Sequence, residues 1–226
     1  MSFQFNANRK YFKPIAWKLP AAIALVGVIM LNSSAGPRGM IPILIALLLF
    51  GLQFLGRGSA LSLDRQCDEA VCGLKEKAIR KFVLDEDEVS EVDPIVLNGY
   101  QVEDLWLQPM FRVENGQWRT SNYDGTIILF SAEQLYYYKY SFSLVNNKQN
   151  EVAQELFYND IVSIETRREN CVKYAGSRRH EISYNTFAIK TTGGNEFRTS
   201  FKDSDGIERS IAGMKQLVRE RKRSDK

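Results

Sequence analysis

The fold is decided by two apolar stretches near the start of the chain, LPAAIALVGVIML at residues 19–31 and MIPILIALLLFGLQFL at residues 40–55. The link between them, NSSAGPRG at residues 32–39, is short and polar. A helix that crosses a bilayer needs about 20 mostly apolar residues, with a lower limit of about 17. The first stretch reaches that length if residues 15–17 join it, and the second is close to it if Gln53 is tolerated near its end. The two stretches therefore predict a transmembrane helical hairpin.

The residues that flank the hairpin support this interpretation. Tyr11, Phe12 and Trp17 stand among basic residues, as an aromatic belt with a positive flank does. The alternatives are a pair of buried core helices, for which about 10–14 residues would be ordinary, or a cleaved signal peptide for the first stretch alone. Neither stretch has a polar face, and a second apolar stretch follows the first. Basic residues cluster outside the hairpin, which predicts a multi-pass protein of the cell membrane with its N- and C-termini in the cytoplasm.

The rest of the chain divides by composition. The formal net charge of +3 over 226 residues is too small to indicate nucleic-acid binding by itself. Three cysteines without a CxxC pair fit reduced thiols in the cytosol. We expect four parts: a weakly ordered cytoplasmic arm (1–13), the hairpin (14–56), an amphipathic helix with an acidic linker (57–93), and a β domain with a C-terminal helix (94–226).

An amphipathic helix is predicted between Asp64 and Phe82, because apolar or small residues recur among charged ones at steps of three and four: Cys67, Val71, Leu74, Ala78 and Phe82. It is either a stalk that binds a partner or a helix that packs on its own domain. The spacing does not separate these two alternatives.

From residue 94 onward the chain is rich in β signals. Asn115-Gly116 predicts a tight hairpin between residues 110–114 and 117–120. Further short strands recur every 8 to 15 residues, which is typical of an antiparallel barrel or sandwich. A last helix is expected from its apolar residues, Ile207, Ile211, Met214, Leu217 and Val218.

These patterns resemble a known family. The segment IILFSAEQLYYY (127–138) is similar to an early hairpin of bacterial pleckstrin-homology-like (PH-like) and GRAM-like domains, and FYNDIVSIE (157–165), FAIKTTGG (187–194) and the last helix follow in the expected order. The resemblance covers residues 110–221. It implies an α+β fold, in which the transmembrane hairpin is followed by a PH-like split β-barrel of two antiparallel sheets with a C-terminal α-helix. It also implies binding of lipid headgroups or proteins, without catalysis.

Motifs for catalysis are not found. A single histidine, His180, has no serine or cysteine motif around it, and phosphate-binding loops, HExxH and GxGxxG after a strand are missing. We therefore expect a protein that is not an enzyme, with no catalytic residue, metal or cofactor. One stretch between strands gathers basic side chains that could converge on a phosphate or other anionic ligand, or could simply be solvated: Arg167, Arg168, Lys173, Arg178 and Arg179.

Two functions follow from these expectations. The first is a membrane-anchored binding or scaffold module that presents its β domain to a protein partner at the cytoplasmic face, with outward tyrosines from residues 136–140 as adhesive surface. The second is a lipid-headgroup sensor or lipid-handling subunit, in which the basic stretch reads anionic lipid. A weaker alternative is a membrane effector that oligomerises through its hairpin. The expected partners are the bilayer, a protein and possible anionic lipid, but no nucleic acid.

Overall fold

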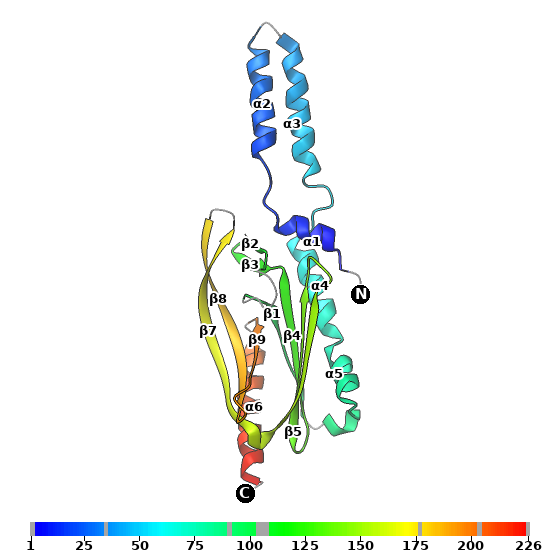
Figure 1. The fold of residues 1–226 in the computed structure, drawn as a ribbon, viewed down its shortest axis with the longest axis vertical. Coiled ribbons are helices and arrows are strands. Elements are labelled where there is room, and N and C mark those ends of the chain that lie inside the picture. The colour runs from blue at the N-terminus through cyan, green and yellow to red at the C-terminus, as the bar shows by residue number, and fades with distance from the viewer. Residues whose placement is uncertain are drawn as a thin grey trace.

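The computed structural model describes residues 3–33, 36–89, 92–102, 109–175, 178–202 and 205–224. The chain is α+β, with three antiparallel sheets and helices at both ends (Figure 1). Its helices are α1 (Phe5–Phe12), α2 (Lys18–Leu31), η1 (Gly36–Gly39), α3 (Met40–Leu52), α4 (Ala60–Cys72), α5 (Leu74–Phe82), η2 (Glu86–Val89), η3 (Tyr158–Asp160) and α6 (Asp205–Ser224). Its strands are β1 (Ile95–Tyr100), β2 (Phe111–Glu114), β3 (Gln117–Thr120), β4 (Asn122–Phe130), β5 (Gln134–Ser143), β6 (Gln149–Phe157), β7 (Ile161–Ala175), β8 (Arg178–Thr191) and β9 (Glu196–Phe201).

The two apolar stretches form helices that are shorter than expected. α2 has 14 residues and α3 has 13, so at about 1.5 Å per residue each is roughly 20 Å long, against about 30 Å for the hydrocarbon core of a bilayer. Among the described residues, no helix combines the length and the apolar character needed to cross a membrane. The expected transmembrane hairpin, and with it the multi-pass localisation in the cell membrane, is therefore not supported.

The helices are short because their ends are fixed by specific features. Trp17 is the N-cap of α2, so residues 15–17 do not extend that helix. α3 ends before its C-cap residue, Gln53, whose side chain joins the two arms of the hairpin: its Oε1 accepts a hydrogen bond from Ala16 N at 2.8 Å and its Nε2 donates to Ala16 O at 3.2 Å. The chain then turns, and Gly56 adopts a positive φ of 65°. Gln53 therefore hydrogen-bonds the two arms together at the base of the hairpin, whereas it was expected to be a polar residue near the end of a membrane span.

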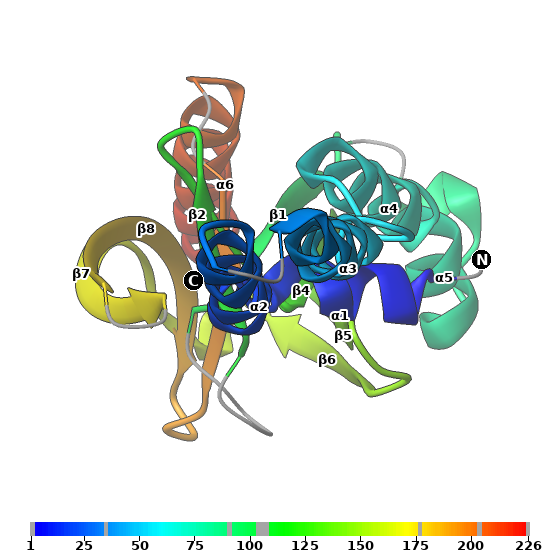
Figure 2. The ribbon, with the colours of Figure 1, turned by 90° about the horizontal axis from the view of Figure 1, so that it is seen from above.

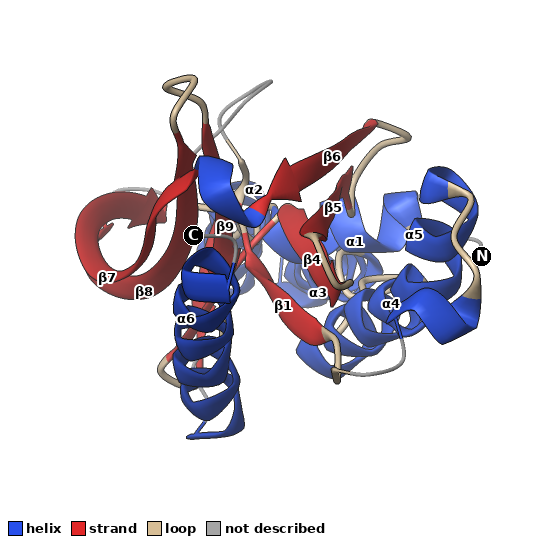
Figure 3. Ribbon diagram, turned by 90° about the horizontal axis from the view of Figure 1, so that it is seen from below, coloured by secondary structure: helices blue, strands red, loops and turns tan. Residues whose placement is uncertain are grey.

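The main sheet has the strand order β1-β4-β5-β6, and helices cover one of its faces (Figures 2 and 3). α4 and α5 pack on this face through small and apolar residues, and α1 joins the same core through Tyr11 and Phe12. Gly125 in β4 allows this approach, since a Cβ there would lie 2.8 Å from Leu74 Cδ1. Of the two alternatives for the amphipathic segment, the structure shows the helix packed on its own domain, broken into two at Gly73.

The second sheet, β7-β8-β9, faces the opposite side of the main sheet (Figure 2). A second core fills the space between the sheets and is closed by α6, whose Ile211, Met214 and Val218 are buried in it. The two sheets meet where β1 crosses β9: Lys202 N donates to Asn98 O at 2.7 Å, and a Cβ on Gly99 would lie 3.0 Å from Phe201 Cα.

Three further expectations need correction. The chain has a third, two-stranded sheet, β2-β3, so the expected fold of a transmembrane hairpin followed by two sheets is wrong. The N-terminal arm was expected to be weakly ordered, but α1 is docked, with Asn8 fully buried. The tyrosines of β5 offer no adhesive surface, because both faces of this strand are covered; they are all buried: Tyr136, Tyr137, Tyr138 and Tyr140.

Candidate functional site

A cleft of about 400 Å³ opens where α4, the β2–β3 turn, the end of β1 and the strands β8 and β9 come together. This volume is within the roughly 300–1,000 Å³ of typical ligand sites. Aromatic side chains supply much of its wall: Tyr100, Trp118, Tyr123, Tyr184 and Phe201. Its charged side chains are Asp64, Asp68, Arg119, Arg168 and Lys202.

One wall of the cleft is held by an ion pair between β3 and α4. Arg119 Nη2 lies 2.7 Å from Asp64 Oδ2, and Arg119 Nε donates to Asp64 Oδ1 at 2.9 Å. Tyr100 donates its hydroxyl to the same Oδ1 at 2.6 Å. Partial burial is the largest influence on the pKa of Asp64 and raises it, but the hydrogen bonds from Arg119 and Tyr100 outweigh it and hold the pKa below its usual value. Asp64 therefore stays ionised, and it organises this wall.

The opposite wall contains an open strand edge. β9 pairs with β8 only from Asn185 to Lys190, because Phe201 opposite Asn185 is the last residue of the ladder. From Arg178 to Ser183, no described strand pairs with the edge of β8 that faces away from β7. Ser183 lines the cleft from this part of β8, and Tyr184 and Asn185 continue the lining toward β9. An unpaired row of backbone N–H and C=O groups can accept a further strand.

A second hollow, which we call the groove, lies between β7 and α6 and has a volume of about 420 Å³. It shares Arg168, Asn185 and Phe201 with the cleft, so the two hollows are neighbours. The groove adds basic Arg167 and Lys215 and acidic Glu208. Together the cleft and the groove carry five basic and three acidic side chains. Arg119 pairs with Asp64 and Arg167 with Glu165, so three cations and two carboxylates remain, a small basic excess.

The five basic residues predicted from the sequence are not gathered at one point. Arg167 and Arg168 lie in the half of β7 next to the groove, where Arg167 forms an ion pair with Glu165. Lys173 is opposite His180 near the far end of the β7–β8 ribbon. Arg178 is at the start of β8, and the neighbouring Arg179 Nη2 lies 3.6 Å from Glu181 Oε1. Only Arg168 lines both hollows.

Sequence reasoning missed most of the residues that line the cleft. Asp64 and Arg119 are separated by 55 positions, and no local motif connects them. Trp118 follows the Asn115-Gly116 turn, which is the one signal that could have directed attention to this hairpin. Lys202 and Lys215 come from the end of β9 and from α6 and meet Arg168 only through the crossing of the two sheets.

The described residues offer little that points to catalysis. No group of three or more His, Cys, Asp or Glu side chains within them could hold a metal ion. Cys67 lines the cleft, but burial is the main cause that raises its pKa and keeps the thiol uncharged. His180 lies beside Phe111, with ring centroids 5.9 Å apart, and outside the cleft. That the chain is not an enzyme stays a prediction.

Comparisons with known proteins give no family. Protein-family models, curated proteins and solved structures each return no match to this chain. The expected identification as a PH-like or GRAM-like domain with a transmembrane hairpin is therefore not supported, because no relative is found and no helix within the described part of the chain could span a membrane. Hydrophobic alternation and glycine turns, on which the resemblance depended, are shared by many antiparallel proteins.

Proposed function

We propose that this chain is a non-enzymatic binding module that takes up an extended, acidic segment of a partner protein along the cleft and the groove. The observation that carries this proposal is the open edge of β8 inside an aromatic cleft. When an extended peptide adds to a sheet edge, main-chain hydrogen bonds supply affinity and pockets for alternate side chains supply specificity. The unpaired edge up to Ser183 offers the main-chain groups, and Trp118 lines the other wall.

The acidic character of the partner follows from three cations that form no close ion pair within the described part of the chain and outnumber the remaining carboxylates of the two hollows, Asp68 and Glu208. Arg119 and Asp64 neutralise each other. Arg168 and Lys215 form no ion pair with any described residue, and Lys202 forms none either. These three cations are exposed, or partly so, along the path from the cleft to the groove. Carboxylates of a partner segment would pair with them, and Arg168 can bind a carboxylate through two parallel hydrogen bonds.

The first test selects ligands from random twelve-residue peptides displayed on phage, with the purified full chain as the target. We expect enrichment of acidic peptides with β-branched or aromatic residues at alternate positions. A labelled synthetic copy of one such peptide is then titrated against variants. Trp118→Ala and Arg168→Glu should each weaken binding by about tenfold or more. A side chain that becomes buried in an interface typically contributes about 1.4 kcal/mol or more to binding. The matched control is Arg80→Glu, an exposed arginine on α5 outside both hollows, which should leave binding unchanged.

A second measurement tests the strand addition itself. The peptide should slow hydrogen exchange of the amides of β8 between Arg178 and Ser183. Two peptides are then compared, one N-methylated at its odd-numbered residues and the other at its even-numbered residues. The set of amides that donates to β8 should abolish binding when it is methylated, and methylation of the other set should leave binding unchanged. If no peptide is enriched, or if the cleft variants bind like the wild type, the proposal is wrong. It is equally wrong if no peptide binds, while vesicles of anionic lipid bind the wild type and do not bind Arg168→Glu.

A further inference from the structure

The apolar hairpin, which we define as α2, η1 and α3, projects away from the rest of the molecule (Figure 1). The substantial contacts of α2 and α3 are with each other and with η1. No ionisable residue occurs from Leu19 to Pro37 or from Gly39 to Gly56, so Arg38 at the tip is the single charge between Lys18 and Arg57. A surface of this kind exceeds what an isolated soluble chain usually exposes, and it marks an interaction site.

The packing inside the hairpin is made by small residues. Gly27, Gly39 and Ala46 are buried between the helices. A Cβ on Gly27 would lie 2.7 Å from Gly39 O, and a Cβ on Gly39 would lie 2.6 Å from Gly27 O, so the backbones touch where these glycines meet. A hairpin that is stable as a separate unit in water would bury large apolar side chains between its helices. This hairpin buries small residues there and exposes most of its large ones.

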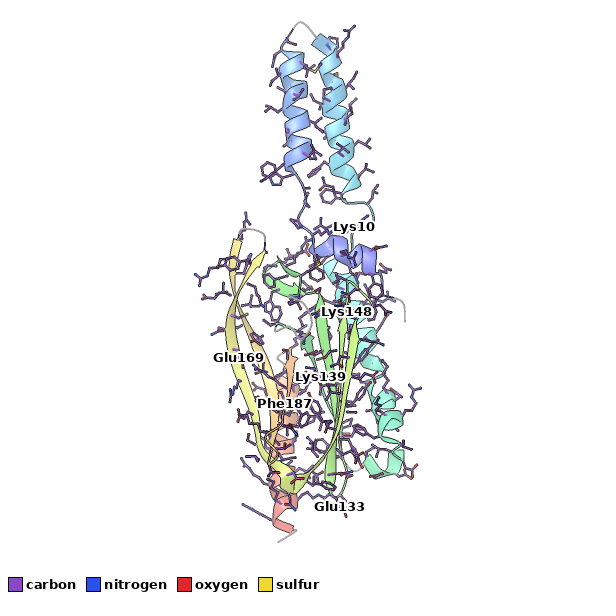
Figure 4. All side chains as sticks on the ribbon, viewed as in Figure 1. Lys10, Glu133, Lys139, Lys148, Glu169 and Phe187 are labelled. Atoms are coloured by element: carbon purple, nitrogen blue, oxygen red, sulfur yellow. The ribbon has the colours of Figure 1, made fainter. Side chains whose placement is uncertain are left out.

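The large apolar side chains point outward all around the hairpin (Figure 4). Fourteen of them are between 39% and 64% exposed. They are Leu19, Leu25, Val26, Val28, Ile29 and Leu31 in α2, and Met40, Ile41, Leu44, Ile45, Leu47, Leu48, Phe50 and Leu52 in α3. At roughly 200 Å² for a fully exposed large side chain, they present on the order of 1,400 Å² of apolar surface.

We infer that the hairpin docks on the hairpin of a second copy of this chain and forms a four-helix bundle with it. If about half of that surface lies on the contacting face, two copies would bury roughly 1,400 Å² in total, within the about 1,200–2,000 Å² of a specific interface. The helices match in length, at 14 and 13 residues, so two hairpins can overlap along their whole extent. Arg38 stays in solvent at the tip. This interface is independent of the cleft and does not depend on the proposed function.

The test is the mass of the full chain in detergent-free buffer, measured by light scattering after size exclusion over a range of micromolar concentrations. We expect the wild type at twice its chain mass of 25.9 kDa, about 52 kDa. Leu44→Glu and Leu48→Glu, at positions 60% and 62% exposed, should each give a monomer of unchanged circular dichroism. The matched control is Leu61→Glu on α4, a leucine that is 78% exposed outside the hairpin and should leave the dimer intact.

A second readout locates the contact. Leu48→Cys in a Cys72→Ser background should form an intermolecular disulfide under mild oxidation, whereas Leu61→Cys in the same background should not. A monomeric wild type overturns the inference, as does a dimer that survives both glutamate variants. Wild-type protein that binds vesicles of neutral lipid through the hairpin while it stays monomeric in their absence would assign the surface to lipid and would also overturn it.

Discussion

Lys139 Nζ lies 3.0 Å from Asp124 Oδ2 in the space between the main sheet and the second sheet, with 10% and 2% of the two side chains exposed. The ammonium group also donates to Arg198 O of β9 at 2.9 Å, and Ser141 donates its hydroxyl to Asp124 Oδ1 at 2.7 Å. Figure 4 places Lys139 at mid-height of the β domain. This pair joins the two sheets through one buried network.

Replacing Lys139 by methionine should destabilise the fold by about 3–5 kcal/mol, because the carboxylate of Asp124 would remain buried without its counter-ion. The double variant Asp124→Leu with Lys139→Met should be closer to the wild type, since it leaves no unpaired charge. Urea denaturation at neutral pH measures both. The exposed Lys148→Met is the control, with a change under about 0.5 kcal/mol. If Lys139→Met proves as stable as the double variant, or more stable, this account is wrong.

The docking of α1 depends on Asn8, which is fully buried. Its Nδ2 donates to Gln66 Oε1 at 2.9 Å and to Leu144 O at 2.8 Å. Asn8→Ala should cost about 1–3 kcal/mol, because these buried acceptors lose their donor. Limited proteolysis of residues 3–12 should also become faster. Asn6→Ala, two positions away and exposed, is the control and should change neither quantity.

Stability should fall in alkaline solution as buried tyrosines ionise. Burial, followed by a hydrogen bond to Glu114, raises the pKa of Tyr11 to about 12, and burial also raises the pKa of Tyr158 to about 12. A raised pKa in the folded state means that the stabilising contribution is complete below the unfolded value of 10.0 and is lost as the pH rises through about 12. Melting temperature should therefore decline between about pH 10 and pH 12. In a titration followed by ultraviolet absorbance, the absorbance change of tyrosine ionisation is compared between the wild type and a Tyr11→Phe, Tyr158→Phe double variant. The variant should show a smaller change near pH 12 and the same change near pH 10.

The turn beside the cleft requires glycine. Gly116 adopts a φ of 75° and Asn115 a φ of 52°, as a tight hairpin between β2 and β3 demands. Gly116→Ala should cost about 1–2 kcal/mol, since a Cβ is strained in this conformation. Gly213→Ala, in α6 with open space around it, should be neutral or stabilising by up to about 1 kcal/mol. Equal effects in the two variants would show that the turn conformation is not what matters.

Local signals predicted local structure well. The Asn115-Gly116 hairpin and the helix with Ile211, Met214 and Val218 are confirmed, because turn chemistry and a 3.6-residue period act over short distances. The apolar stretches form two helices, but the prediction that these helices cross a membrane is wrong, because they have only 14 and 13 residues. Beyond α3, Gln53 bonds Ala16, a contact between residues 37 positions apart. Hydropathy alone does not contain that information.

The candidate site could hardly be predicted at all. The cleft is made where β1 crosses β9 and where α4 meets β3, so Asp64, Trp118, Arg168 and Lys202 come from four separate segments of the chain. The five basic residues were expected in one stretch between strands, whereas they lie within β7 and β8. The sequence also could not show that Arg179 lies near Glu181 and that Arg167 pairs with Glu165. The tyrosines of β5 were misjudged because period-two alternation cannot show that a strand is covered on both faces.

The base of the hairpin has a practical consequence. Gly58 N donates to Ala7 O at 2.9 Å, and Arg57 donates to the carbonyls of Tyr11 and Lys13, so the chain leaves the body and returns to it at one place. The segment from Trp17 to Leu52 is thus an insertion between two parts of the chain that contact each other directly. Excising it and rejoining the ends through a short flexible linker would remove none of the residues that form the three hydrophobic clusters of the body.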